Sequence, residues 1–186
     1  TVNGRVEATS LDQNATALRI GSLARVNEIL VNGAINAAGG GANGTRVTAI
    51  QIDAGALTTR LTNKGAILAK VNGDKAVGTA LVDRAGTLTG IINQGRIAVE
   101  GATGTDRAIA LDLAANTTGV SIIQSRLSET ATAPEITGNI LLGSGNDLID
   151  VLAGKIAGKI VFGAGNDRLL LSSEASYSGA VSFGSG

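Results

Sequence analysis

Two acidic turns with nearly the same sequence carry the side chains best suited to bind a metal ion. Asp147 ends the motif Gly-Ser-Gly-Asn-Asp at 143–147, and Asp167 ends the motif Gly-Ala-Gly-Asn-Asp at 163–167. Calcium prefers roughly six to eight oxygen ligands, which carboxylates and the open carbonyls of glycine turns can supply. Asp147 and Asp167 are therefore the candidate metal ligands, with calcium as the metal. The alternative interpretation is structural, because Asn and Asp in turns also hydrogen-bond the backbone.

Candidates for catalysis are few. The chain has no His and no Cys, which excludes Ser-His-Asp and Cys-His sites and leaves acid-base chemistry to carboxylates. Asp53 and Asp83 follow similar apolar segments and are the carboxylate pair to weigh for a glycan lyase or hydrolase. The aromatic residues that could stack on a sugar are Phe162, Tyr177 and Phe183, all near the C-terminus. We therefore assign no catalytic or cofactor-binding residue, interpret both aspartates as solvated turn residues and expect no enzyme.

The composition indicates a folded chain with an aliphatic interior. Hydrophobic residues make up 44% and aromatic residues 2%, so Ala, Val, Ile and Leu must fill the core. A disordered chain would be poorer in branched aliphatic residues. The 15 basic residues balance 15 acidic ones without a dense basic run, which argues against a nucleic-acid partner.

A repeat organises these residues. Glycines recur at a nearly regular interval, each shortly after an Asn and shortly before a Val or Ile: Gly4, Gly33, Gly65 and Gly95. The segments between the turns alternate apolar and polar residues, as at 50–53, which is the period of a half-buried strand. Three short strands and three turns in each repeat of about 30 residues predict an all-β fold, a parallel β-helix.

The repeat changes along the chain. Gly143, Gly163 and Gly184 follow one another more closely than the earlier glycines, so the turns shorten to about 20 residues from position 136. We expect one β-helix segment over 1–186, with longer turns at 1–124, a polar excursion at 125–135 and short Gly-Asn-Asp turns at 136–186. Since the pattern starts and stops midway through a repeat, we expect a fragment of a longer solenoid.

Two further features follow from the repeat. Asn32, Asn63 and Asn93 precede equivalent glycines, so we expect a stacked ladder of side-chain amides that satisfies turn backbone groups. Polar stretches of unequal length at 36–46 and 100–106 are typical of protruding loops, which tolerate changes in length. We expect these loops to contact a partner.

These motifs resemble a known family. The ladder of Asn-x-Gly-x-Ile at 63–67 and 93–97, which passes into the acidic turns, is similar to the β-helical passenger domain of type V autotransporters of Gram-negative bacteria. The resemblance implies a right-handed, three-faced helix, secretion to the cell surface, and a parent chain linked to an outer-membrane β-barrel. The acidic turns also resemble the calcium-binding nonapeptide repeat of RTX proteins, although their spacing is 20 and not nine, and Leu142 and Phe162 replace its first glycine.

The sequence therefore predicts a non-enzymatic structural stalk or adhesin-like interaction module on the bacterial surface. Its partner would be a surface protein, a glycan or another copy of the chain. A carbohydrate-active β-helix and a calcium-stabilised scaffold remain as alternatives.

Overall fold

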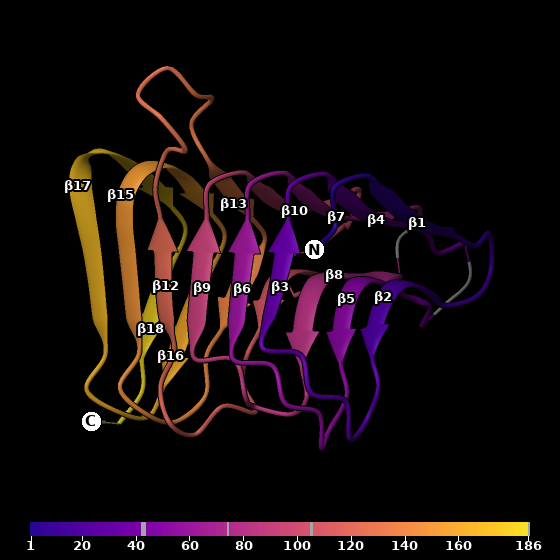
Figure 1. The fold of residues 1–186 in the computed structure, drawn as a ribbon, viewed down its shortest axis with the longest axis horizontal. Coiled ribbons are helices and arrows are strands. Elements are labelled where there is room, and N and C mark those ends of the chain that lie inside the picture. Colours follow the sequence, from indigo (N-terminus) through magenta and orange to yellow (C-terminus); the bar gives the residue numbers. More distant parts are fainter. Residues whose placement is uncertain (42–43, 74, 105, 186) are drawn as a thin grey trace.

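The computed structural model describes residues 1–41, 44–73, 75–104 and 106–185. Within these ranges the protein is all-β, and its strands pair in parallel and stack as a β-solenoid (Figure 1). The predicted parallel β-helix is confirmed. Over the same residues, the structure has no apolar helix of membrane-spanning length.

Each coil contributes one strand to each of three ladders. The first ladder contains β1 (Arg5–Thr9), β4 (Ala34–Gly39), β7 (Ala66–Val71), β10 (Arg96–Glu100), β13 (Glu135–Thr137) and the second halves of β15 (Leu148–Ala157) and β17 (Arg168–Ser178). The second contains β3 (Glu28–Val31), β6 (Arg60–Asn63), β9 (Gly90–Asn93), β12 (Ser121–Gln124) and the first halves of β15 and β17. The third contains β2 (Ala15–Ile20), β5 (Arg46–Ile52), β8 (Val77–Asp83), β11 (Ala108–Asp112), β14 (Asn139–Leu141), β16 (Ile160–Gly163) and β18 (Val181–Phe183).

The coil shortens both in one connection and in its strands. Between the first and third ladders, residues 101–107 join β10 to β11, whereas Gly138 alone joins β13 to β14. In the next coil, residues 158–159 make the same connection between β15 and β16. The strands shorten as well, since β8 has 7 residues and β14 has 3, and the three ladders stay intact.

The interior consists of aliphatic columns in register. On the first ladder, equivalent inward positions hold Val6, Ile35, Ile67, Ile97, Ile136, Ile156 and Tyr177. The five isoleucines of this column are fully buried. Because coils are about 4.8 Å apart, each side chain packs on the equivalent one above and below it, and apolar burial stabilises the fold by about 25 cal/mol per Å².

Glycine occupies the corner between the second and first ladders because the backbones of successive coils approach closely there. A Cβ on Gly33 would clash with the carbonyl oxygen of Gly4, one on Gly65 with that of Gly33, and one on Gly95 with that of Gly65. The glycines that repeat in the sequence therefore form a column in which each glycine lies against the backbone of the preceding coil.

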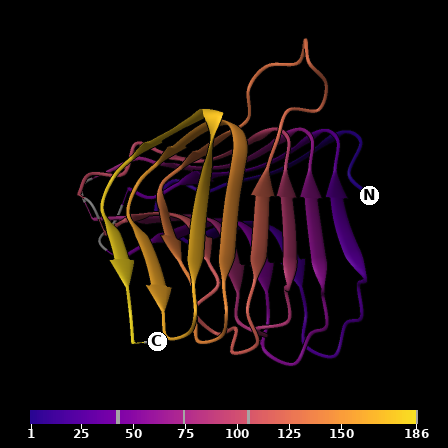
Figure 2. The ribbon, with the colours of Figure 1, turned by 90° about the vertical axis from the view of Figure 1, so that its left-hand side faces the viewer.

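An arm projects from the solenoid between β12 and β13. It consists of residues 125–134 and rises above the coils in two perpendicular views (Figure 1 and Figure 2). The polar excursion predicted at 125–135 ends earlier, because Glu135 belongs to β13. Arg126 secures the base of the arm, since its guanidinium donates to the Ala131 carbonyl at 2.8 Å and to the Glu174 carboxylate at 3.3 Å.

Candidate functional sites

The two acidic turns lie on successive coils, and their carboxylates cap backbone groups. The Oδ1 atom of Asp147 accepts a hydrogen bond from the Val120 N–H at 2.7 Å. One coil later, the Oδ1 atom of Asp167 accepts from the Asp147 N–H at 2.9 Å. Each carboxylate thus satisfies a backbone donor of the preceding coil, which is the structural role that the turn sequence allowed.

The second carboxylate oxygen of Asp147 has no such role. Asp147 is 2% exposed, and its Oδ2 atom is buried without a hydrogen-bond partner. Burial raises the pKa of Asp147, the Val120 N–H lowers it, and the nearby charge of Asp167 raises it. Among the described residues no cluster of three or more His, Cys, Asp or Glu could hold a metal ion. A cation here would therefore rely on two carboxylates and on backbone carbonyls.

Asp53 and Asp83 do not form a carboxylate pair. The register pairs Asp83 with Ile52, so the two aspartates are offset by one residue, and their predicted equivalence is wrong. A shift of one residue turns a side chain to the other side of a strand. Asp83 is accordingly buried, so its interpretation as a solvated turn residue is wrong. Its carboxylate accepts hydrogen bonds from three backbone N–H groups, those of Ala85, Gly86 and Leu88.

Asp53 instead joins a surface ion pair. Its carboxylate accepts hydrogen bonds from the Gln51 amide at 2.6 Å and from the Arg19 guanidinium at 2.7 Å. The Gln51 bond and then Arg19 lower the pKa of Asp53, despite an opposing effect of desolvation. Asp53 therefore stays ionised and is poorly suited to act as a general acid.

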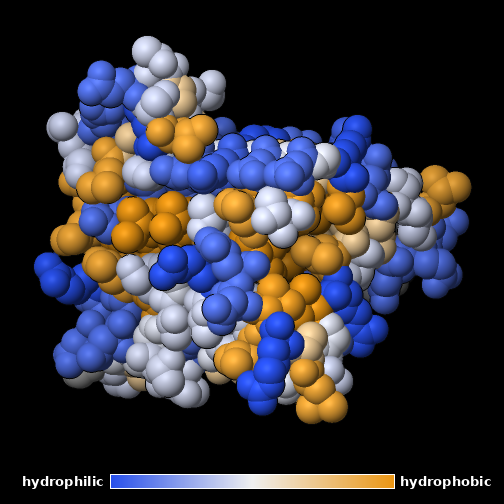
Figure 3. All heavy atoms as spheres, in the orientation of Figure 1, coloured by the Kyte–Doolittle hydropathy of each residue, from blue (hydrophilic) through white to orange (hydrophobic). Residues whose placement is uncertain are grey.

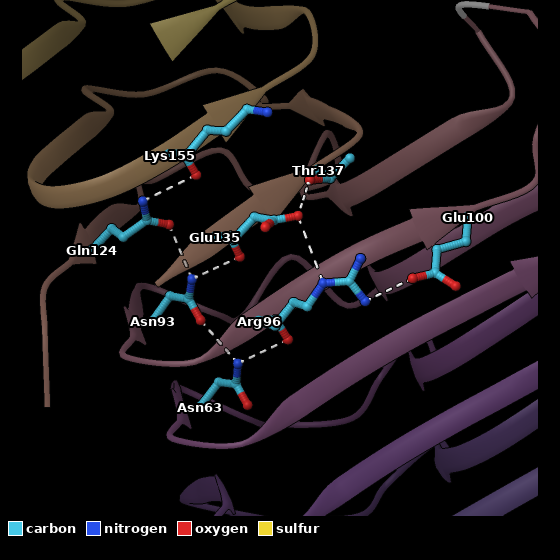
Figure 4. A network of polar contacts seen from close by, with 8 residues as sticks. All are labelled: Asn63, Asn93, Arg96, Glu100, Gln124, Glu135, Thr137 and Lys155. Atoms are coloured by element: carbon cyan, nitrogen blue, oxygen red, sulfur yellow. Dashed lines mark hydrogen bonds and ion pairs between the residues drawn. The ribbon is translucent and has the colours of Figure 1, made fainter. Parts of the chain in front are cut away.

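A ladder of side-chain amides runs through the corner between the second and first ladders (Figure 4). The Asn63 amide donates to Asn93 Oδ1 at 2.9 Å, and the Asn93 amide donates to Gln124 Oε1 at 3.0 Å. The Gln124 amide ends the ladder by donating to the carbonyls of Ala153 and Lys155, each at 3.2 Å. All three amide side chains are fully buried, so they link four coils without solvent.

The membership of this amide ladder differs from the prediction. Asn63 pairs in register with Val31, and Asn32 lies one position later, where it is exposed and bonds to Asn3. Gln124 escapes sequence reasoning because no Asn-x-Gly motif marks it. The sequence feature that could have identified Gln124 is the strand pattern, because Gln124 ends the segment Ser-Ile-Ile-Gln in the way that Asn93 ends Gly-Ile-Ile-Asn.

On the outside of the first ladder, charged groups flank a small residue. The Arg96 guanidinium pairs with Glu100 at 2.7 Å and with Glu135 at 3.6 Å, and the Thr137 hydroxyl donates to Glu135 (Figure 4). These exposed pairs contribute little to stability individually. Ala98, which alternates with the inward-facing Ile97, is nevertheless fully buried beside this network.

A polar pocket on the third ladder has no counterpart among the sequence motifs. It has a volume of about 240 Å³ and is lined by Thr48, Thr79, Arg46, Arg84 and Asp112, among others. The two threonines alternate with inward residues, yet are only 7% and 8% exposed, so this stretch of the ladder is recessed. Hydroxyl, guanidinium and carboxylate groups are those that hydrogen-bond sugars or polar peptide groups.

The bounds of both predicted interaction loops differ from those expected, and the first loop is also shorter. Residues 36–39 belong to β4 and Arg46 begins β5, which leaves 40–45 as the connection. The second loop spans 101–107, because Glu100 ends β10. Residues 42, 43 and 105 of these loops lie outside the described ranges.

In comparisons with known proteins, no family model, curated protein or solved structure matches this chain. The strand pairing establishes the fold without the help of a relative.

Proposed function

We propose that the chain is a non-enzymatic structural stalk or adhesin-like interaction module, displayed on the surface of a Gram-negative bacterium. The observation that carries this proposal is the unbroken stack of coils. The isoleucine column and the buried amide ladder connect each coil to the next. Such a stack resists bending because the backbone groups of each strand pair with those of its neighbours. A rigid rod with a projecting arm is suited to hold a binding surface away from a membrane.

The recessed pocket on the third ladder is the proposed contact for a glycan. Arg46 and Arg84 supply guanidinium donors there, and Thr48 and Thr79 supply hydroxyl groups. Of the two carboxylates among the described lining residues, that of Asp83 is committed to three backbone donors. This arrangement supports binding without turnover.

A glycan array combined with a reducing-sugar assay tests the proposal. We expect binding of a subset of glycans, loss of that binding in the Arg46→Ala/Arg84→Ala variant, and no sugar release. Arg25→Ala, a change of an exposed arginine outside the pocket, is the matched control. Turnover that disappears in the Asp53→Asn variant would establish the carbohydrate-active alternative. Antibody labelling of intact bacteria tests surface display separately.

A calcium-stabilised scaffold is a second candidate, favoured by the buried Oδ2 atom of Asp147 that lacks a partner. A calcium ion between Asp147 and Asp167 would supply the missing contact and reduce the repulsion between the two carboxylates. Calcium should then raise the melting temperature, EGTA should reverse the effect, and Asp147→Ala should abolish the response. An identical melting temperature in calcium and EGTA removes this candidate.

A further inference from the structure

The outer face of the second ladder carries two columns of side chains in register. The first column contains Glu28, Arg60, Gly90, Ser121, Leu148 and Arg168. The second contains Leu30, Thr62, Ile92, Ile123, Asp150 and Leu170. Both columns alternate with the buried residues Ile29, Leu61, Ile91, Ile122 and Ile149, so they point outward.

Charged residues lie on the two strands at each end of this face, and the two middle strands carry Ile92 and Ile123 and no charge. Glu28 and Arg60 lie on the first two strands, while Asp150 and Arg168 lie on the last two. Within the described part of the chain, none of these four makes an ion pair, and the Glu28 carboxylate accepts only the Thr62 hydroxyl. Figure 3 shows patches of apolar side chains on the side of the molecule that carries β3, β6, β9 and β12.

The order of charges makes the face complementary to itself when the coil order is reversed. We propose that this face binds a second copy of the chain about a two-fold axis that lies in the interface, between β9 and β12 and parallel to them. Ile92 then packs on the partner's Ile123, and Glu28 meets the partner's Arg168. Arg60 lies opposite the partner's β15. The partner's Asp150 is two residues further along that strand, about 6.6 Å away, a distance that an arginine side chain spans.

The opposite arrangement is disfavoured by the same charges. If the coil order were preserved across the interface, Glu28 would lie level with the partner's Glu28, and Arg60 with the partner's Arg60. Like charges brought together at an interface cost affinity, so they disfavour that arrangement. A two-fold contact also closes on itself, so it gives a dimer and not an open filament.

The face is accessible and small. The arm rises beyond the upper end of the ladder and leaves the face uncovered in both ribbon views (Figure 1 and Figure 2). Six strands about 4.8 Å apart and about 13 Å long give far less than the roughly 800 Å² per partner of a stable interface. We therefore infer a weak, concentration-dependent dimer. The dimer rests on the proposed function and deepens it, because it names a second copy of the chain as the partner of one side of the stalk.

Sedimentation equilibrium over about 10 μM to 1 mM protein tests the dimer, a range chosen for an interface of this size. We expect the dimer fraction to rise with protein concentration and to fall with added salt. Arg60→Glu and Asp150→Arg should each give a monomer, because each places like charges opposite one another. An equimolar mixture of the two variants should dimerise again, since the new carboxylate of one chain then meets the new guanidinium of the other.

Lys70→Glu is the matched control, because Lys70 is exposed on the first ladder and its charge reversal should leave the dimer unchanged. Far-UV circular dichroism checks that each variant is folded. A protein that stays monomeric at low salt, a dimer that survives Arg60→Glu, or a variant mixture that stays monomeric overturns the proposal. None of these results affects glycan binding or surface labelling, so failure of the dimer is distinguishable from failure of the proposed function.

Discussion

The side-chain amide of Asn63 donates to the Oδ1 atom of Asn93 over 2.9 Å, from one coil to the next, and both residues are fully buried. Each amide has donor and acceptor groups to satisfy, and it finds partners in a neighbouring coil. The buried amides of this corner therefore fix the register of successive coils, while the aliphatic columns contribute most of the buried apolar surface.

Asn93→Ala should destabilise the protein by about 2 to 4 kcal/mol, because it leaves buried groups of Asn63 and Gln124 without a partner. Urea unfolding followed by circular dichroism measures the loss. Asn32→Ala, at the exposed position one residue out of register, should cost less than about 0.5 kcal/mol. Equal losses in both variants would contradict the importance of the buried ladder.

Gly65→Ala should prevent the native corner from forming, since the new Cβ would overlap the carbonyl oxygen of Gly33. The backbones of two coils must separate to make room, so we expect a loss of about 3 kcal/mol or more. Gly21→Ala adds the same atom where nothing lies within 4 Å and should change the urea midpoint little. A Gly65→Ala protein as stable as the Gly21→Ala control would show that the corner is not tightly packed.

The raised pKa of Asp147 predicts a specific dependence of stability on pH in EGTA. Because the folded protein binds the Asp147 proton more tightly than the unfolded chain does, this group costs stability as pH rises through its unfolded and then its folded pKa. Wild-type protein should therefore gain stability relative to Asp147→Asn as the pH falls from 7 toward about 4. Paired urea titrations give this difference directly, and an unchanging difference would mean that Asp147 has an ordinary pKa.

Phe162→Ala should cost about 3 to 5 kcal/mol, the usual loss for a large buried aromatic side chain. Phe162 is fully buried and stacks on Phe183, with ring centroids 4.8 Å apart. Phe183 is 56% exposed, so Phe183→Ala should be clearly less destabilising. Thermal unfolding of the two variants compares them, and the reverse order would contradict the packing of these coils.

Register explains why some residues that look equivalent in the sequence lie on successive coils at matching positions and others do not. The acidic turns at Asp147 and Asp167 do lie on successive coils, because their motifs and spacing are nearly identical. Asp53 and Asp83 look equivalent because their flanking segments are similar, but coils of different length shift the pairing by one residue. A similar one-residue offset separates Asn32 from the amide ladder.

Sequence alone specifies that this chain coils into a parallel β-helix, because strand period, turn residues and a glycine at each close corner repeat along it. Those signals are local, and they survive changes in loop length. The three-dimensional packing was needed to show which side chains are enclosed, such as Gln124 and Asp83, and which outer positions line up across coils, such as Glu28 and Arg60. The reason is physical: successive side chains along a strand point to opposite sides, so the environment of each depends on a register that loops of unequal length conceal.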